Sequence, residues 1–175
     1  IRQLAQKYRY MDLDKVGIWG HSGGGFATAA AMFNYPDFYD VGISESGNHD
    51  NRNYEDDWGE RYIGLMETVE GVNNYAVQAN ALNAKNLKGK LLLAHGGMDD
   101  NVPPYNTYLV VDALVKANKD FDLIIFPNAR HGFGSDTFYM MRRRWDYFVK
   151  HLKGQTPPKE YKFKFKMDPR MRQGF

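Results

Sequence analysis

The sequence contains no cysteine, which excludes disulfide bonds, thiolate metal sites and a cysteine nucleophile. It also shows no recognisable signal peptide and no apolar run long enough to span a membrane. Lysine and arginine number 23 against 21 for aspartate and glutamate, a formal net charge of +2. This near balance argues against a dedicated nucleic-acid-binding protein. The hydrophobic share of 43% suffices for the core of one domain, or of part of one, in 175 residues.

The most informative motif is Gly20-His21-Ser22-Gly23-Gly24, which follows the apolar segment 16–19. A G-x-S-x-G sequence between a buried strand and a helix of small residues is typical of a nucleophile elbow, which exposes its serine on a strained turn. The flanking glycines remove side chains that would clash there, and the following helix directs free N–H groups towards a reacting carbonyl. The pattern favours a serine hydrolase, with a structural tight-turn serine as the alternative.

Apolar segments and helical patterns alternate along the chain. The segments 16–19, 41–44, 91–94 and 121–126 predict buried strands. Helices are expected over 1–10, 22–34 and 74–87, from Pro103 onward, and near the C-terminus over 138–152. Strands that alternate with helices indicate an α/β fold whose mainly parallel sheet carries helices on both faces.

Three segments need separate comment. Residues 47–66 are too irregular for a core element. In the last helix, an apolar stripe recurs at helical spacing and predicts the buried face. It comprises Phe138, Met141, Trp145, Phe148 and Leu152. A tail is expected over 155–175, in which residues 161–166 alternate apolar and basic in the manner of an exposed edge strand.

A nucleophilic serine needs a base, and that base needs a carboxylate to hold its tautomer. Asp99 follows the third predicted strand and His131 the fourth, in the order that an α/β-hydrolase requires. Because active groups gather at the carboxyl ends of parallel strands, Ser22, Asp99 and His131 can converge there. The alternative is that the acid caps the next helix and that the histidine is an ordinary loop residue.

The remaining histidines are weaker candidates. His21 points the other way round the turn, His95 belongs to a strand end, and His49 and His151 have no partners in the pattern. No pair of histidines has metal-ligand spacing, so neither a metal nor another cofactor is expected. The backbone N–H of Gly23 is the expected first oxyanion donor. Too few residues precede the elbow to supply a second donor or the first strands of such a sheet.

Four segments together resemble the catalytic domain of the prolyl oligopeptidase family, and most closely its dipeptidyl peptidase IV branch. They are residues 20–26, 60–65, 95–102 and 131–132. The resemblance covers about residues 1–154 and implies the C-terminal part of an α/β-hydrolase peptidase domain. The tail over 155–175 has no counterpart in it.

By this resemblance the chain is part of a serine peptidase that releases X-Pro or X-Ala dipeptides. Ser22 corresponds to the nucleophile, Asp99 to the orienting acid and His131 to the general base. Asn101 matches a residue that binds a substrate carbonyl, and the pocket for the proline ring is implied at three further positions. These are Tyr54, Trp58 and Val102. Aromatic faces suit a flat apolar ring, although surface packing is the alternative role for both aromatic residues.

The sequence departs from the branch in two ways. Gly23 and Trp58 both stand where the branch usually has tyrosine, and Asn48 and Asn51 are polar where apolar or aromatic residues are usual. The family's N-terminal β-propeller, with the glutamates that bind the substrate amine, and its upstream oxyanion tyrosine are absent from these residues. We therefore expect a piece of a longer protein, periplasmic or secreted and bacterial by the resemblance.

Other functions stay open at this point. A general ester or acyl hydrolase would carry the same triad, because a fold does not fix a substrate. An inactive fragment could instead pair with a second copy through exposed sheet edges and form a homodimer. A peptide is the expected substrate, and neither nucleic acid nor a membrane is an expected partner of this segment.

Overall fold

A computed structural model describes residues 1–163 of the chain. Its main sheet contains four parallel strands in the order β1-β2-β5-β6. The strands are β1 (Gly17–His21), β2 (Val41–Glu45), β5 (Lys90–Gly96) and β6 (Asp122–Phe126). Within the sheet, Ile43 is paired with Trp19 on one side and Leu92 on the other. The predicted α/β class and its mainly parallel sheet are confirmed.

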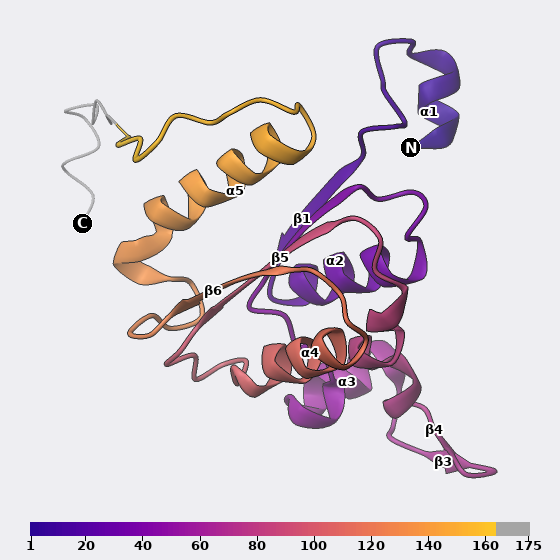
Figure 1. Cartoon of the computed structure of the whole chain (residues 1–175). Coiled ribbons are helices and arrows are strands. Elements are labelled where there is room, and N and C mark those ends of the chain that lie inside the picture. The colour runs from indigo at the N-terminus through magenta and orange to yellow at the C-terminus, as the bar shows by residue number, and fades with distance from the viewer. Residues whose placement is uncertain (164–175) are drawn as a thin grey trace, which may run out of the picture.

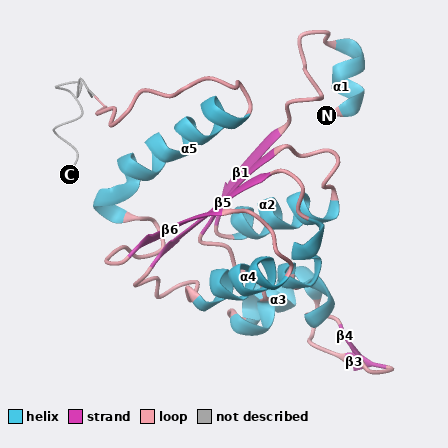
Figure 2. Ribbon diagram, in the orientation of Figure 1, coloured by secondary structure: helices cyan, strands magenta, loops and turns pink. Residues whose placement is uncertain are grey.

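Helices cover both faces of this sheet (Figures 1 and 2). On one face lie α2 (Gly23–Asn34) and α4 (Tyr105–Lys116), and on the other lies α5 (Thr137–His151). The alternation of side chains along β5 explains why both faces are apolar. Leu91 and Leu93 pack in the core against α2 and α4, whereas Leu92 packs in the core against α5.

Parts of the chain differ from the prediction. The segment predicted as irregular contains η1 (Asn51–Asn53) and α3 (Asp56–Ile63), and residues 47–51 are buried. The helix predicted over 74–87 is instead two 3₁₀ segments, η2 (Ala76–Gln78) and η3 (Asn80–Asn86), after a short hairpin. Its strands are β3 (Thr68–Val69) and β4 (Val72–Asn73). Asn73 and Asn80 use their side chains on backbone groups and on His49, which favours turns over a regular α-helix.

The apolar stripe predicted for α5 is only partly its buried face, because Phe148 and Leu152 pack against the sheet core and the rest of the stripe does not. Phe138 and Trp145 are exposed, whereas Met140 and Tyr147 are buried against the sheet. The ring of Phe163 lies 6.5 Å from that of Phe138 and 5.2 Å from that of Trp145. Part of the stripe therefore packs against the chain that follows α5. Residues 161–163 form no strand, and the rest of the predicted edge strand, 164–166, lies outside the described residues.

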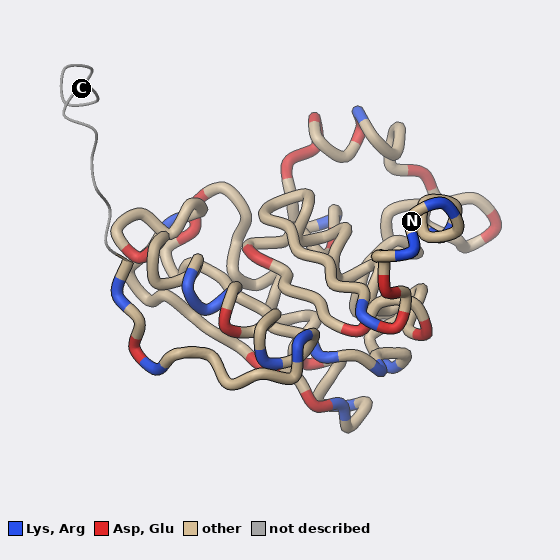
Figure 3. Tube along the Cα trace, turned by 90° about the horizontal axis from the view of Figure 1, so that it is seen from above, with Lys and Arg blue, Asp and Glu red and all other residues tan. Residues whose placement is uncertain are grey.

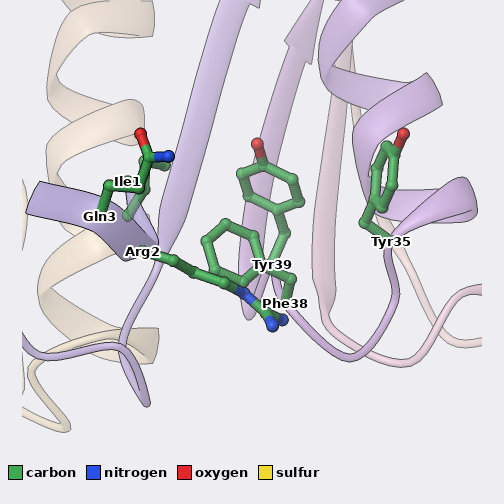
Figure 4. A pocket seen from close by; sticks show the side chains of 6 residues that line it. All are labelled: Ile1, Arg2, Gln3, Tyr35, Phe38 and Tyr39. Carbon is green, nitrogen blue, oxygen red and sulfur yellow. The ribbon is translucent and has the colours of Figure 1, made fainter. Parts of the chain in front are cut away.

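The amino ends of the strands carry a shallow hollow between α1 (Arg2–Lys7) and the segment that connects α2 to β2 (Figure 4). Its volume is about 590 Å³, and the Arg2 guanidinium lies 5.1 Å from the centroid of the Phe38 ring. Along the Cα trace of residues 1–163, basic and acidic residues are interspersed (Figure 3). Within residues 1–163, no helix combines the length and the apolar character that crossing a bilayer requires.

Candidate active site

The turn after β1 holds Ser22 in a strained backbone conformation. Its φ of 59° and ψ of −124° are rare for a residue with a side chain, and they place it at the N-cap of α2. The turn is held by the N–H of Ser22, which donates to the carbonyl of Glu45 at 2.8 Å. Gly23, as the first residue of α2, has no intrahelical acceptor for its N–H. This is the local geometry that the G-x-S-x-G motif predicts.

Asp99 and His131 come together at the same end of the sheet, from the loops after β5 and β6. The Nδ1 of His131 lies 2.8 Å from Oδ2 of Asp99, whose side chain is fully buried. Because an ionised carboxylate can only accept, Nδ1 of His131 carries the hydrogen and Nε2 is left as the acceptor. The helix-cap alternative for this acid does not hold, because the N-cap of α4 is Pro104 and no side chain caps this helix.

The elbow and the histidine loop are joined through the backbone. The carbonyl oxygen of His131 lies 2.6 Å from Nε2 of His21 and accepts from the hydroxyl of Ser46 at 3.4 Å. Because His21 directly precedes Ser22, these bonds hold the loop of His131 against the elbow. The Ser22 hydroxyl itself takes part in no hydrogen bond among residues 1–163. Catalytic hydrogen bonds are often long without substrate and tighten when it binds.

The residues predicted to bind substrate gather around the elbow, with one exception. Tyr54 donates its hydroxyl to Oδ1 of Asn101 at 2.9 Å, and its ring centroid lies 6.1 Å from that of Trp58. A β-carbon added at Gly23 would lie 2.9 Å from the Trp58 ring, so the indole stands directly beside the residue after Ser22. Val102 is fully buried and presents no surface to a ligand.

The identity of residue 23 follows from this packing. The sequence has glycine there and a large indole at position 58, and the two are complementary in volume because a side chain at 23 would meet the ring. The two departures from the family branch, glycine at position 23 and tryptophan at position 58, are therefore coupled by their packing. The aromatic character of the Tyr54 and Trp58 wall is retained, and the ring of Tyr62 extends it with a centroid 4.6 Å from that of Trp58.

Two buried histidines behind this site were passed over in the sequence. His95, at the end of β5, lies 3.1 Å through its Nε2 from Oδ2 of Asp99. His49 sits behind the elbow, where its Nδ1 lies 2.9 Å from the amide nitrogen of Asn80. Burial lowers the pKa of His49 to about 3, so the ring is neutral near pH 7. The spacing of His95 and Asp99 was the signal available in the sequence, because both flank the same turn.

A buried ion pair closes the α5 side of the site. Arg144 donates two hydrogen bonds to the carboxylate of Glu45, at 2.8 and 2.9 Å, and its guanidinium lies 3.8 Å from the Trp19 ring centroid. The backbone carbonyl of Glu45 also accepts from the N–H of Ser22. The ion pair at its side chain therefore fixes the end of β2 beneath the elbow. Among residues 1–163, no group of three histidine, aspartate or glutamate side chains is placed to hold a metal ion.

Comparison with known proteins shows where this arrangement occurs. The model of the prolyl oligopeptidase family matches residues 1–155. Human dipeptidyl peptidase 8 is 34% identical over 134 residues, which are 75% of this chain and 15% of that protein. Dipeptidyl peptidase 4 of Trichophyton rubrum is 32% identical over 160 residues, 87% of this chain and 20% of its own length.

A solved structure agrees with the sequence matches. The crystal structure of Porphyromonas gingivalis dipeptidyl peptidase 4 superposes with a TM-score of 0.76 and 31% identity, covering 85% of this chain and 21% of that one. The chain thus spans about a fifth or less of the length of these relatives. Since the family model covers nearly all of the described residues, the chain belongs to the prolyl oligopeptidase family.

Proposed function

We propose that this chain is the catalytic part of a longer serine peptidase that releases X-Pro or X-Ala dipeptides from the N-terminus of peptides. The observation that carries the proposal is the buried contact of 2.8 Å between His131 and Asp99. It lies at the same end of the sheet as a serine with strained dihedral angles, on the turn that the G-x-S-x-G motif predicts. The names of the relatives support the dipeptidyl class.

The proposed chemistry begins with a proton transfer. Nε2 of His131 accepts the proton of the Ser22 hydroxyl as its oxygen attacks the scissile carbonyl, and Asp99 stabilises the imidazolium that forms. The N–H of Gly23 donates to the developing oxyanion. His131 then returns the proton to the leaving amine, which leaves an acyl-enzyme on Ser22. Water attacks this ester with His131 again as the base, and the dipeptide is released.

The proposed substrate contacts involve the aromatic wall beside the elbow. Tyr54 and Trp58 would pack against the ring of a proline at the cleaved bond, because flat apolar rings bury well against aromatic faces. The amide of Asn101 would donate to a substrate carbonyl, since its oxygen is already occupied by the Tyr54 hydroxyl. An N-terminal β-propeller of the same protein would bind the free amine of the peptide.

The experiment compares two substrate types with the full-length protein that contains this chain. Gly-Pro and Ala-Pro amides and simple acyl esters are supplied to the wild type and to Ser22→Ala. We expect release of the dipeptides by the wild type and none above background by the variant. Turnover of esters without dipeptide amides would contradict the peptidase assignment and favour a general acyl hydrolase.

A second arm uses the chain of 175 residues by itself. We expect it to be nearly inactive, because the fold supplies its second oxyanion donor from an early loop, and loss of one donor costs on the order of a hundredfold or more in rate. Efficient hydrolysis of Gly-Pro amides by this chain alone would contradict the expectation that upstream residues complete the site.

A further inference from the structure

The Asp99 carboxylate is contacted by a second imidazole besides that of His131. His95 is the last residue but one of β5. Its Nε2 lies 3.1 Å from Oδ2 of Asp99, and Nδ1 of His131 lies 2.8 Å from the same oxygen. The side chains of His95 and Asp99 are both fully buried. Two imidazoles therefore share one carboxylate oxygen, one from the exposed side of the site and one from the interior.

The neighbours of His95 define its tautomer. Nε2 also lies 3.0 Å from the backbone carbonyl oxygen of Val102, and Nδ1 lies 2.7 Å from the hydroxyl of Thr107. A carbonyl and a carboxylate can only accept, so Nε2 carries the hydrogen, and this single hydrogen is bonded to the carbonyl of Val102 and shared with the nearby Oδ2 of Asp99. Nδ1 is then the acceptor, and the hydroxyl of Thr107 donates to it. Burial lowers the pKa of His95, which keeps the ring neutral.

This contact completes the surroundings of the carboxylate. Oδ1 of Asp99 accepts from the backbone N–H groups of Asn101 and Val102, each at 3.0 Å. Oδ2 faces the N–H groups of His131 and His95. An ionised carboxylate offers about four lone-pair sites; three of them accept hydrogen bonds here, and the fourth lies beside the Nε2–H of His95, which the carboxylate shares with the carbonyl of Val102. Removal of any donor would leave a buried negative charge partly unsatisfied, which is costly in a dry site.

The other titratable groups around this pair are neutral or occupied. His49, behind the elbow, is neutral because burial lowers its pKa to about 3. Tyr54, whose hydroxyl donates to Asn101, stays a neutral phenol, since burial raises its pKa. Asp100 and Arg130 pair with each other at the surface. His131 is thus the group through which a change at the carboxylate reaches the reaction.

We propose that His95 is a positioning residue for Asp99: its neutral Nε2–H holds the carboxylate in the orientation that His131 needs and takes up part of its negative charge. This role depends on the function proposed above. If the donor is removed, the whole charge of Oδ2 acts on His131 and stabilises its protonated form. The base then becomes active only at higher pH, and the loosened carboxylate slows the reaction.

Two substitutions of similar size separate this role from simple filling of space. The amide nitrogen of His95→Gln reaches the position of Nε2 and can still donate to Asp99, whereas the shorter His95→Asn reaches only the position of Nδ1 beside Thr107. We expect His95→Gln to retain kcat/KM within a few-fold. For His95→Asn we expect a loss of about 10- to 100-fold, the range for a lost hydrogen bond to a charged group, mainly in kcat, with the acidic limb of the pH profile moved to higher pH.

The assay uses the full-length protein, Gly-Pro amide and a fluorophosphonate probe at matched pH values. Equal kcat/KM values for the two variants, or a slower His95→Asn with an unmoved acidic limb, would overturn the positioning role. If the wild type reacts with the probe at Ser22 but the two variants have the same kcat/KM, only the positioning role of His95 is refuted. If the wild type does not react with the probe, the proposed peptidase function is refuted, and the positioning role of His95, which depends on it, is refuted as well.

A measurement on the wild type does not depend on the folding of any variant. Nitrogen NMR of protein with labelled histidine rings reports which ring nitrogen of His95 is protonated. We expect hydrogen on Nε2 and none on Nδ1 over the whole pH range of activity. Hydrogen on Nδ1, or a ring that becomes charged in that range, would overturn the proposal, because such a ring does not act as the neutral donor from Nε2.

Discussion

The Asp99 carboxylate and the turn after β1 differ in the contacts that hold them, although the backbone of the loops after β5 and β6 is also closely packed, since a β-carbon at Gly96 would meet the carbonyl oxygen of Arg130. Asp99 is fixed by polar contacts, because its carboxylate faces donors from the backbone and from His131 and His95. The elbow around Ser22 is fixed largely by close packing of backbone against backbone. Substituting Gly25, for example, would bring a β-carbon into the carbonyl oxygen of Glu45.

The difference shows how one site can be fixed in two ways. An acid must stay buried and oriented, and a full set of donors achieves this without strain. A nucleophile must be exposed on a tight turn, and the absence of side chains permits the strand and the helix to approach closely enough. The orientation of the Asp99 carboxylate should therefore be sensitive to lost hydrogen bonds, and the elbow to added atoms.

The largest effect is expected from Asp99→Asn. An amide keeps the shape but presents its own hydrogens, which favours the wrong tautomer of His131 and should lower kcat about 10⁴-fold. Asp100→Asn is the matched control. It changes only a surface pair with Arg130, and such exposed pairs contribute about 0–1 kcal/mol. Comparison of kcat for both variants on a Gly-Pro amide checks this, and equal losses would contradict the choice of acid.

The close packing of the elbow around Ser22 should be disrupted by a single added methyl group. In Gly25→Ala, the added β-carbon would meet the backbone of Glu45 and lie 3.0 Å from Cα of Gly47. Because backbone cannot move aside cheaply, we expect a loss of about 3 kcal/mol in the free energy of unfolding. In Gly24→Ala, no atom lies within 4 Å of the new carbon, so we expect no loss and a gain of up to about 1 kcal/mol. Urea denaturation of both variants measures the contrast, and similar stabilities would refute it.

The buried His49 behind the elbow should make the stability of the protein depend on pH. Burial lowers the pKa of His49 from its ordinary value of 6.5 to about 3. Below pH 6.5 the unfolded chain therefore binds a proton that the folded chain does not, and stability falls as the pH drops from 6.5 towards 3. From pH 7 to pH 5 this group should account for a loss of about 2 kcal/mol.

Urea denaturation at both pH values measures this loss in wild type and in His49→Gln, which keeps a polar side chain without a titratable ring. The variant should lose less stability than the wild type on acidification. If both proteins lose the same amount, the pH dependence comes from other groups and the assignment to His49 is wrong.

The smallest effect on activity is expected from loss of the hydrogen bond between Tyr54 and Asn101, which joins the aromatic wall beside the elbow to the loop of Asp99. Tyr54→Phe removes the hydroxyl that donates to Asn101 at 2.9 Å and leaves the aromatic ring in place. Since the bond is exposed, we expect a loss of about 1 kcal/mol, seen as a several-fold rise in KM for a Gly-Pro amide with little change in kcat. A large fall in kcat instead would place Tyr54 in the chemical step rather than in substrate binding.

Much of the fold could be predicted because local rules and tertiary structure agree along it. The segments 41–44 and 91–94 lie in the two central strands, β2 and β5, and are buried as predicted. The segment 16–19 leads into the edge strand β1, where Trp19 is half exposed, so the prediction of a buried strand is wrong there. The elbow was predictable from its G-x-S-x-G motif, although only one of the two flanking glycines is needed to avoid a clash: a β-carbon at Gly20 would meet the backbone of Gly24, whereas Gly24 itself has open space around it. The convergence of Asp99 and His131 followed from strand order, since parallel strands bring their carboxyl ends to one edge.

Other features depend on contacts between distant residues, which periodicity does not encode. In the stripe of α5, Phe138 and Trp145 lie against Phe163 rather than against the sheet, whereas Phe148 and Leu152 pack against the sheet as predicted. Residues 47–51 look like a surface loop by composition but are buried, since their polar groups find partners such as Asn106. The second imidazole on Asp99 was missed because a histidine at a strand end is ordinary until its neighbour is known.

The most direct test of the site is covalent labelling of the full-length protein with a fluorophosphonate probe, followed by mass mapping of the modified peptide. Ser22 should carry the label, and the Asp99→Asn and His131→Ala variants should react far more slowly while keeping their fold. A protein that labels elsewhere, or not at all, would contradict the assignment of Ser22, Asp99 and His131 and would leave the elbow with a purely structural role.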